Sequence, residues 1–236
     1  MKRIATVVLS GGQDSTTCLF WALNQRDFAE VRAVTFNYGQ RHRREIEAAA
    51  HIAFIANVEH EIIDVGPLLR SRSPLTDPKA ELETYANYES MDKIIGDRVE
   101  LTFVPMRNAF FLTLAANIAL SHDSFDLVTG VCEADNANYP DCRAIFIGHQ
   151  EETINQALGI ETFRIHTPLI DLSKAQSIKL AQETPGAMEA LAYSHTCYAG
   201  EYPPCGKCHA CVLRQHGFDE AGVVDPLIER AAQEHF

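Results

Sequence analysis

The segment that most constrains this chain is Ser10-Gly11-Gly12-Gln13-Asp14-Ser15, which follows a short apolar run near the start of the sequence. Residues 4–9 have the composition of a strand covered on both faces, and residues 15–25 have the apolar spacing of a helix. In an open parallel sheet, a turn that leads from a strand into a helix faces the crevice where ligands bind. The segment, called the glycine turn below, therefore predicts both a fold class and the place of a ligand site.

Strands and helices alternate through the rest of the first half. Residues 31–36 and 59–65 are predicted strands, and residues 43–56 form a predicted helix between them. Further strands are predicted at residues 100–104, 125–130 and 162–166, and further helices at residues 108–120, 145–157 and 173–182, the last with Ser173 as its N-cap. This succession predicts an α/β fold with a Rossmann-like open, mostly parallel sheet and helices on both faces.

Composition narrows the class of protein. The 236 residues are 46% hydrophobic and 22% charged, which is typical of a globular chain that folds without disulfides. No apolar run approaches the roughly 20 residues of a membrane span, and the first residues do not resemble a signal peptide. The net charge of −12 disfavours binding of nucleic acid through phosphate contacts. We therefore expect a cytoplasmic protein with neither a membrane nor a direct nucleic-acid partner.

Four of the seven cysteines, Cys197, Cys205, Cys208 and Cys211, follow the spacing C-x7-C-x2-C-x2-C. Four thiolates satisfy one tetrahedral zinc ion and leave no open position, so we expect one structural Zn²⁺. An iron–sulfur cluster is the alternative, because C-x2-C-x2-C also occurs in ferredoxins. The neighbouring His195 and His209 are treated as non-ligands.

The change in composition after Tyr193 suggests a boundary. Cysteine, proline and glycine dominate from there to Gly217. Earlier in the chain, residues 70–96 form a polar stretch without clear periodicity, which we expect to be a lid or a binding insertion. We divide the chain into an α/β domain, residues 1–192, and a C-terminal zinc-binding segment packed on it, residues 193–236.

The glycine turn has the features of a phosphate cradle. Gly11 and Gly12 permit positive φ angles, so that backbone N–H groups converge at the start of a helix, and Ser10 and Ser15 add hydroxyl groups. The turn contains no lysine and matches neither the Walker A pattern nor G-x-G-x-x-G. The alternative is a simple strand–helix turn with Asp14 as a cap.

Polar loops follow the second, fourth and fifth predicted strands. Residues 38–42, 104–108 and 130–143 carry guanidinium, amide and carboxylate groups. Arginine can hold a carboxylate with two hydrogen bonds, and carboxylates can hold Mg²⁺ against a triphosphate. For any one of these residues taken singly, a solvated loop charge is the alternative.

The glycine turn resembles the S-G-G-x-D-S signature of the PP-loop, or N-type ATP pyrophosphatase, superfamily. This resemblance implies a fold of the adenine nucleotide alpha-hydrolase type, ATP and Mg²⁺ as cofactors, and activation of an oxygen by adenylation with release of pyrophosphate. A tRNA-thiolating member of the superfamily with an iron–sulfur cluster, and a zinc-ribbon module that binds nucleic acid without catalysis, remain alternatives.

Six motifs together resemble the 7-cyano-7-deazaguanine synthases of this superfamily. They are Ser10–Leu19, Tyr38-Gly39-Gln40-Arg41-His42, Arg107-Asn108, Tyr139-Pro140-Asp141-Cys142-Arg143, Thr167-Pro168-Leu169 with Ser173-Lys174, and the four cysteines. The resemblance implies an ATP-dependent carbon–nitrogen ligase that converts 7-carboxy-7-deazaguanine and ammonia into the nitrile, in the synthesis of the queuosine precursor. It also implies a homodimer.

The resemblance assigns roles to individual residues. ATP contacts are expected from Leu9, Ser10, Gly11, Gly12, Gln13, Asp14, Ser15 and Thr16. Substrate contacts are expected from Gln40, Arg41, His42, Arg107, Tyr139 and Arg143. Catalytic roles are expected for Asp14, Ser15, Arg107, Asn108 and Asp135, with Asp135 as a carboxylate that handles Mg²⁺ or ammonia.

Two departures from the family pattern lie beside these residues. Met106 stands where the family commonly has glycine, and Asn136-Ala137-Asn138 replaces the more usual aromatic-Ser-Gly. These departures bear on the geometry of two loops and not on the class of reaction.

Overall fold

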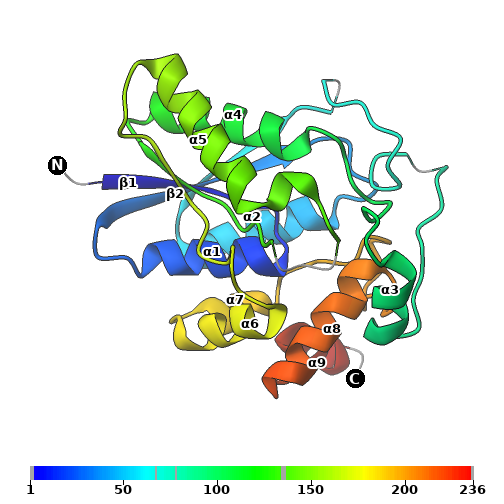
Figure 1. The fold of residues 1–236 in the computed structure, drawn as a ribbon. Helices are drawn as coiled ribbons and strands as arrows, with labels where there is room; N and C mark the ends of the chain where they lie inside the picture. The colour runs from blue at the N-terminus through cyan, green and yellow to red at the C-terminus, as the bar shows by residue number, and fades with distance from the viewer. Residues whose placement is uncertain (1–2, 67, 78, 134–136, 235–236) are drawn as a thin grey trace.

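A five-stranded sheet forms the centre of the protein. The computed structural model describes residues 3–66, 68–77, 79–133 and 137–234 (Figure 1). In the described residues all paired strands are parallel, in the order β3-β2-β1-β4-β5. The strands are β1 (Arg3–Val8), β2 (Phe28–Asn37), β3 (Glu59–Asp64), β4 (Asp126–Val128) and β5 (Arg164–His166). The predicted parallel α/β sheet is confirmed.

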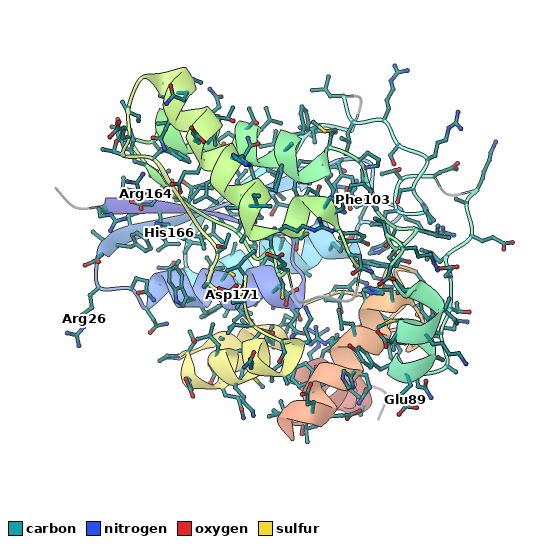
Figure 2. All side chains as sticks on the ribbon, viewed as in Figure 1. Arg26, Glu89, Phe103, Arg164, His166 and Asp171 are labelled. Carbon is teal, nitrogen blue, oxygen red and sulfur yellow. The ribbon has the colours of Figure 1, made fainter. Side chains whose placement is uncertain are left out.

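Helices cover both faces of the sheet, as the alternation predicted (Figure 1). Leu19 and Ile52 belong to a core between β1 and the helices α1 (Gln13–Leu23), α2 (Arg44–Ala56), α6 (Lys174–Glu183) and α7 (Ala187–Leu191). Leu112 and Phe163 belong to a second core on the other face, which is covered by α4 (Arg107–Ser121) and α5 (Ala144–Leu158). Side chains fill the space between these layers, and His166 marks the position of β5 in Figure 2.

The strand order reverses direction at β1, and this reversal positions the ligand site. The chain moves from β1 outward to β3, then crosses to the opposite side of β1 to form β4 and β5. Val7 of β1 pairs with Val128 of β4, so the loops after these two strands emerge side by side. Such a reversal opens a crevice at the carboxyl ends of the strands. The glycine turn therefore lies at the topological switch point.

The prediction of a strand at residues 100–104 is wrong. This segment makes turns: the Phe103 amide donates to the Glu100 carbonyl at 3.1 Å, and the Thr102 amide donates to the Glu100 carboxylate at 2.7 Å. These local hydrogen bonds occupy backbone donors that a sheet ladder would need. The fourth strand in the sequence is therefore β4, and Arg107 and Asn108 begin a helix instead of following a strand.

Four α-helices were not predicted, and one of them is the five-residue α7. Within residues 70–96, α3 (Tyr88–Ile95) begins at a capping box in which Asn87 and Ser90 exchange hydrogen bonds. In the C-terminal segment, α8 (His209–Ala221) packs on α6 and α3, and α9 (Pro226–Glu234) packs on α7. The predicted Ser173 N-cap is confirmed and also forms a capping box, with Gln176. Pro140–Cys142 forms a short 3-10 helix.

Within the described ranges, none of the helices combines the length and the apolar character that crossing a membrane requires.

Candidate active site

The two serines of the glycine turn are joined to each other. Their hydroxyl oxygens lie 2.9 Å apart, and the Ser15 hydroxyl also accepts from the Ser10 amide at 3.1 Å and donates to the Gly12 carbonyl at 3.2 Å. The turn is thus held in a defined shape at the start of α1. Preorganised donors of this kind are what an anion-binding turn needs.

Gly11 holds the turn against α2. Its φ is +86°, and a Cβ atom built there would lie 2.2 Å from the Glu45 carbonyl oxygen and 2.7 Å from the Ala49 amide nitrogen. Both neighbours are backbone atoms and cannot rotate away. Glycine is therefore required at this position for two reasons, the left-handed backbone and the close approach of the helix.

A cavity of about 280 Å³ opens at the carboxyl ends of the strands. Its walls come from the glycine turn, the loop after β2, the start of α4, the loop after β4, and the cysteine-rich segment. The predicted site residues that line it are Leu9, Ser10, Gly12, Gln13, Asp14, Ser15, Gln40, Arg107, Asn108 and Tyr139. The cavity thus brings together the predicted phosphate cradle and several of the predicted substrate contacts.

Lys174 supplies the cation that the glycine turn lacks in sequence. Its ammonium group lies 3.0 and 2.9 Å from the two carboxylate oxygens of Asp14, and its side chain is almost completely buried. Gly217 of α8 makes room for it, because a Cβ there would lie 2.4 Å from Lys174 Cγ. A lysine from α6 therefore reaches the cavity beside the predicted phosphate cradle.

Arg107 lines the same cavity as the glycine turn. Its guanidinium lies 5.9 Å from the centre of the Tyr38 ring. Burial raises the pKa of Tyr38 to about 12, against the opposing effect of Arg107, so this phenol stays neutral. A charged guanidinium beside a neutral phenol is well suited to hold a carboxylate.

Asn108 is held by Asp141 in the loop between β4 and α5, and Tyr139 of the same loop is held by residues 100 and 102. Asn108 donates its amide to the Asp141 carboxylate at 3.2 Å and its side-chain nitrogen to the Asp141 carbonyl at 3.1 Å. The Tyr139 hydroxyl lies 2.5 Å from the Thr102 hydroxyl and donates to Glu100 at 3.2 Å. Both side chains therefore have fixed orientations.

Among the described residues, five of the predicted ATP and substrate contacts do not line the cavity, and one of them is Gly11, which packs against α2. Arg41 is exposed and donates to the carbonyl oxygens of Ala80 at 2.9 Å and Pro74 at 3.4 Å. His42 packs edge-on against His195, at a distance of 5.2 Å between ring centres. The remaining two are Arg143, which is exposed, and Thr16, which is buried.

The buried Thr16 has a visible structural role, since its hydroxyl donates to the Gly12 carbonyl at 2.7 Å. Asp135 lies outside the described residues.

Each departure from the family pattern has one described residue in left-handed backbone, and Asn136 of the second departure lies outside the described residues. Met106 has φ +66° and precedes α4, and Asn138 has φ +56°. These are positions at which glycine is favoured. The backbone at residues 106 and 138 is therefore compatible with glycine.

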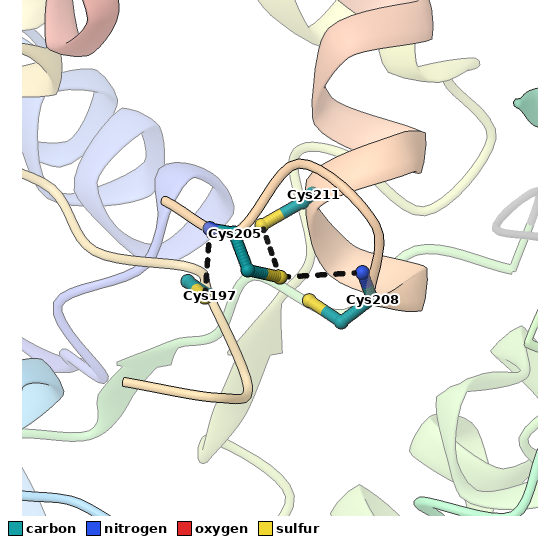
Figure 3. A group of neighbouring side chains, drawn as sticks. All are labelled: Cys197, Cys205, Cys208 and Cys211. Carbon is teal, nitrogen blue, oxygen red and sulfur yellow. Dashed lines mark hydrogen bonds between the residues drawn. The ribbon is translucent and has the colours of Figure 1, made fainter. Parts of the chain in front are cut away.

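The four predicted cysteine ligands form one cluster (Figure 3). Their sulfur atoms all lie within 4.8 Å of one another, and those of Cys205 and Cys211 are 3.8 Å apart. Sulfur atoms at about 2.3 Å from a tetrahedral ion would be about 3.8 Å apart, so the cluster fits a metal. Backbone amides of Cys205 and Cys208 donate to cluster sulfurs, at 3.4 Å each. Neither His195 nor His209 belongs to this group.

The cysteine cluster is connected to the cavity. His195 lies two residues before Cys197 of the cluster, and its backbone amide donates to the Gly11 carbonyl at 2.8 Å. His195, Tyr198 and His209 all line the cavity. A metal bound by the cysteines would therefore fix the wall next to the glycine turn.

The three cysteines outside the cluster have ordinary surroundings. Cys18 is fully buried in the core. Cys132 and Cys142 both line the cavity. Their thiols contact the Leu172 carbonyl and the Asn108 side chain, respectively.

Comparison with known proteins identifies the family to which this site belongs. The family model described as "Queuosine biosynthesis protein QueC" matches residues 4–222. The chain belongs to the QueC family.

Curated members of the QueC family match the chain over nearly its whole length. A protein of Laribacter hongkongensis is 50% identical over 97% of this chain and 95% of its own, and one of Gloeobacter violaceus is 50% identical over 96% of each. Both are named 7-cyano-7-deazaguanine synthase. The solved structure of NMN synthetase from Francisella tularensis covers 98% of this chain and 82% of its own, with a TM-score of 0.50 and 13% identity. That similarity shows the fold alone.

Several residues of the cavity were missed in the sequence. Lys174 was part of a family motif but had no assigned role, because nothing local indicates that it reaches Asp14. Glu45 also lines the cavity from the first turn of α2. Its position three residues after His42 on a predicted helix is a signal that could have found it.

Proposed function

We propose that this protein converts 7-carboxy-7-deazaguanine and ammonia into 7-cyano-7-deazaguanine at the expense of ATP. The observation that carries the proposal is the cavity that the glycine turn and Arg107 both line, in a chain of the QueC family. The glycine turn offers donors for phosphate, and Arg107 offers a guanidinium for a carboxylate.

In the first half of the reaction, a carboxylate oxygen of the substrate attacks the α-phosphorus of ATP and pyrophosphate leaves. The glycine turn stabilises charge on the departing pyrophosphate through its backbone N–H groups and the hydroxyls of Ser10 and Ser15. Lys174 adds a positive charge beside them. Arg107 orients the carboxylate for this attack, and Asn108 fixes the start of α4 from which Arg107 extends.

Ammonia then attacks the acyl adenylate, AMP leaves and the amide forms. In the second half, the amide oxygen is activated by another ATP and is expelled with AMP, so that the nitrile remains. Gln40 and Tyr139, which line the cavity together with Arg107, are proposed to contact the deazaguanine base. Arg41, His42 and Arg143 do not line the cavity, so this proposal gives them only secondary roles, although Arg143 was predicted as a direct substrate contact.

The cysteine cluster is proposed to hold one structural Zn²⁺. The donor set of four thiolates supports zinc, and all four positions of a tetrahedral ion are occupied by protein. Zinc there would fix the shape of residues 197–211, and the hydrogen bond from the His195 amide to the Gly11 carbonyl connects this segment to the α/β domain of residues 1–192. The catalytic metal is proposed to be Mg²⁺, which neutralises the phosphates of bound ATP, with Asp135 as the carboxylate that handles Mg²⁺ or ammonia.

The setting of the enzyme is part of the proposal. The net charge of −12 supports a cytoplasmic enzyme that makes a free base and does not itself hold tRNA. Family resemblance supports a homodimer.

The function is tested by incubating the protein with the carboxylic acid, ATP, Mg²⁺ and ammonium, and following acid, amide and nitrile by mass spectrometry. The expected result is nitrile, formed through the amide, with two AMP per nitrile. Accumulation of amide alone would make the protein an amidating enzyme. Ser15→Ala should slow turnover, and unchanged turnover would contradict the role of the glycine turn.

A colourless preparation with one zinc per chain is expected from the proposed metal site. A brown protein with an iron–sulfur chromophore would instead favour a tRNA thiolase.

A further inference from the structure

Glu45 lines the cavity, and none of the proposed reaction steps gives its carboxyl group a role. Glu45 belongs to the first turn of α2 and is half-buried. It lines the cavity together with Arg107, Asp14 and Ser15. It thus adds an acidic group to a site otherwise suited to bind anions.

Packing of the glycine turn fixes the place of Glu45. Because a Cβ on Gly11 would lie 2.2 Å from the Glu45 carbonyl oxygen, the backbone of Glu45 is in contact with the glycine turn. The backbone of Glu45 is therefore held beside the glycine turn, and the residue lines the cavity that this turn shares with Arg107.

The Glu45 carboxyl group is available for proton transfer. Within the described part of the chain, no hydrogen bond or ion pair engages it. Burial raises its pKa to about 7, Arg107 of α4 opposes this shift, and the Cys197 sulfur adds to it. A carboxyl group that titrates near neutrality in a cavity is suited to act as a general base.

The other acidic and basic groups of the cavity have partners or lie beside metal ligands. Asp14 and Lys174 form an ion pair, and Glu133 accepts from the Ala144 amide at the start of α5 at 2.9 Å. His195 and His209 are adjacent to the cysteine cluster. Of the described acidic groups in the cavity, Glu45 is the one that has no such structural partner.

The chemistry requires a base. In neutral water ammonia is present mainly as ammonium, whose nitrogen carries four protons. The nitrogen of the product nitrile carries none, so all of these protons must leave the nitrogen during the reaction. One leaves when ammonium becomes ammonia, and another leaves after the C–N bond forms and AMP departs. Two more leave when the activated amide loses AMP and the C≡N bond forms.

We propose that Glu45 is the general base that removes protons from the nitrogen in the amide-forming step. The Glu45 carboxylate takes a proton from the attacking nitrogen as the C–N bond forms, and AMP leaves with the electrons of the C–O bond. The protonated carboxyl then returns its proton to water. This inference rests on the proposed function, since it assigns a residue within that reaction.

The experiment separates adenylation from amide formation. Exchange of labelled pyrophosphate into ATP, with the carboxylic acid present and ammonium absent, reports adenylation alone. Single-turnover formation of amide with ammonium reports the step that needs the base. For Glu45→Gln, we expect exchange within about twofold of the wild type, and amide formation slower by about 10²-fold or more.

The ratio of wild-type to Glu45→Gln amide formation provides a second readout. At any pH both proteins meet the same fraction of ammonia, so the ratio isolates the contribution of Glu45. The carboxyl group acts as a base only when deprotonated, so the wild-type advantage should be full above pH 7 and should disappear as the pH falls through about 7. Glu47→Gln is the matched control, because Glu47 is exposed on the same turn of α2.

The outcomes are distinct. Equal losses of exchange and amide formation would mean that Glu45 binds ATP, magnesium or substrate, and would overturn the inference. Unchanged amide formation would overturn it as well. If Glu45→Gln does not fold, Glu45→Asp, which keeps a shortened carboxylate, is tested by the same comparison and should slow amide formation selectively. A wild-type protein without acid-dependent exchange would refute the proposed function instead.

Discussion

Met106 is the residue whose substitution tests the backbone of the active site most directly. It has φ +66° immediately before α4, whose first residue is Arg107. A residue with a Cβ atom is disfavoured in this conformation by about 1–2 kcal/mol. The side chain of Met106 is 69% exposed, so truncating it removes little buried surface. Met106→Gly should therefore stabilise the protein.

The size of the effect follows from two opposing contributions. Relief of the left-handed strain gains about 1–2 kcal/mol, whereas the greater freedom of glycine in the unfolded chain costs about 0.5–1 kcal/mol. The expected net gain in the free energy of unfolding is about 0.5–1 kcal/mol. For a chain of this length, that corresponds to a rise in Tm of about 1–4 °C.

Urea unfolding and calorimetry of three variants would test this reasoning. Met106→Ala removes the same side chain but keeps a Cβ atom, so it should give no comparable gain. Asn138→Gly should destabilise by about 1 kcal/mol, because asparagine tolerates the left-handed region and the variant loses hydrogen bonds. Those bonds run from the Asn138 side chain to the carbonyls of Gly96 and Arg98, at 2.9 and 3.0 Å. Equal stabilisation by Met106→Ala and Met106→Gly would refute the argument from φ.

Three further substitutions examine the supports of the site. Lys174→Met should lower the rate of adenylation, measured by pyrophosphate exchange, by about 10²–10³-fold. Lys179→Met, on the exposed side of α6, is the control and should leave this rate unchanged. Equal effects of the two substitutions would exclude a role of Lys174 at the phosphates. Gly11→Ala should destabilise the protein by more than about 2 kcal/mol in urea unfolding, because its Cβ would meet the backbone of α2 at 2.2 Å; a stable variant would show that α2 can move away. Cys205→Ser should lower both the metal content, measured by elemental analysis, and the Tm; full metal binding would remove Cys205 from the ligand set.

Local patterns in the sequence were sufficient for much of the fold. The glycine turn, the strand before it and the helix after it lie within about twenty residues, so period and turn chemistry identify them. The four clustered cysteines likewise lie close together in sequence, so their spacing alone predicts that their sulfur atoms meet. The segment at residues 100–104 shows the limit of this approach, since its apolar residues resemble a strand while the Glu100 carboxylate accepts hydrogen bonds from Thr102 and closes a turn.

What the sequence could not provide is contact between distant segments. Lys174 and Asp14 are 160 residues apart in sequence, and no local pattern connects them. The separation of Arg41 from the cavity also depends on distant partners, because its side chain is engaged by the carbonyls of residues 74 and 80. Such pairings are decided by how helices pack on the sheet, and only the folded structure reveals them.

The reach of Lys174 and of the His195 amide to the glycine turn has a consequence for biosynthesis. The residues of the turn are made well before the groups that complete its surroundings, since Lys174 follows Asp14 by 160 residues and the His195 amide follows later. The clustered cysteines follow later still. A nascent chain can therefore form β1 and α1 before the surroundings of the glycine turn are complete, and the cavity is complete only after residues 174 and 195 have been made.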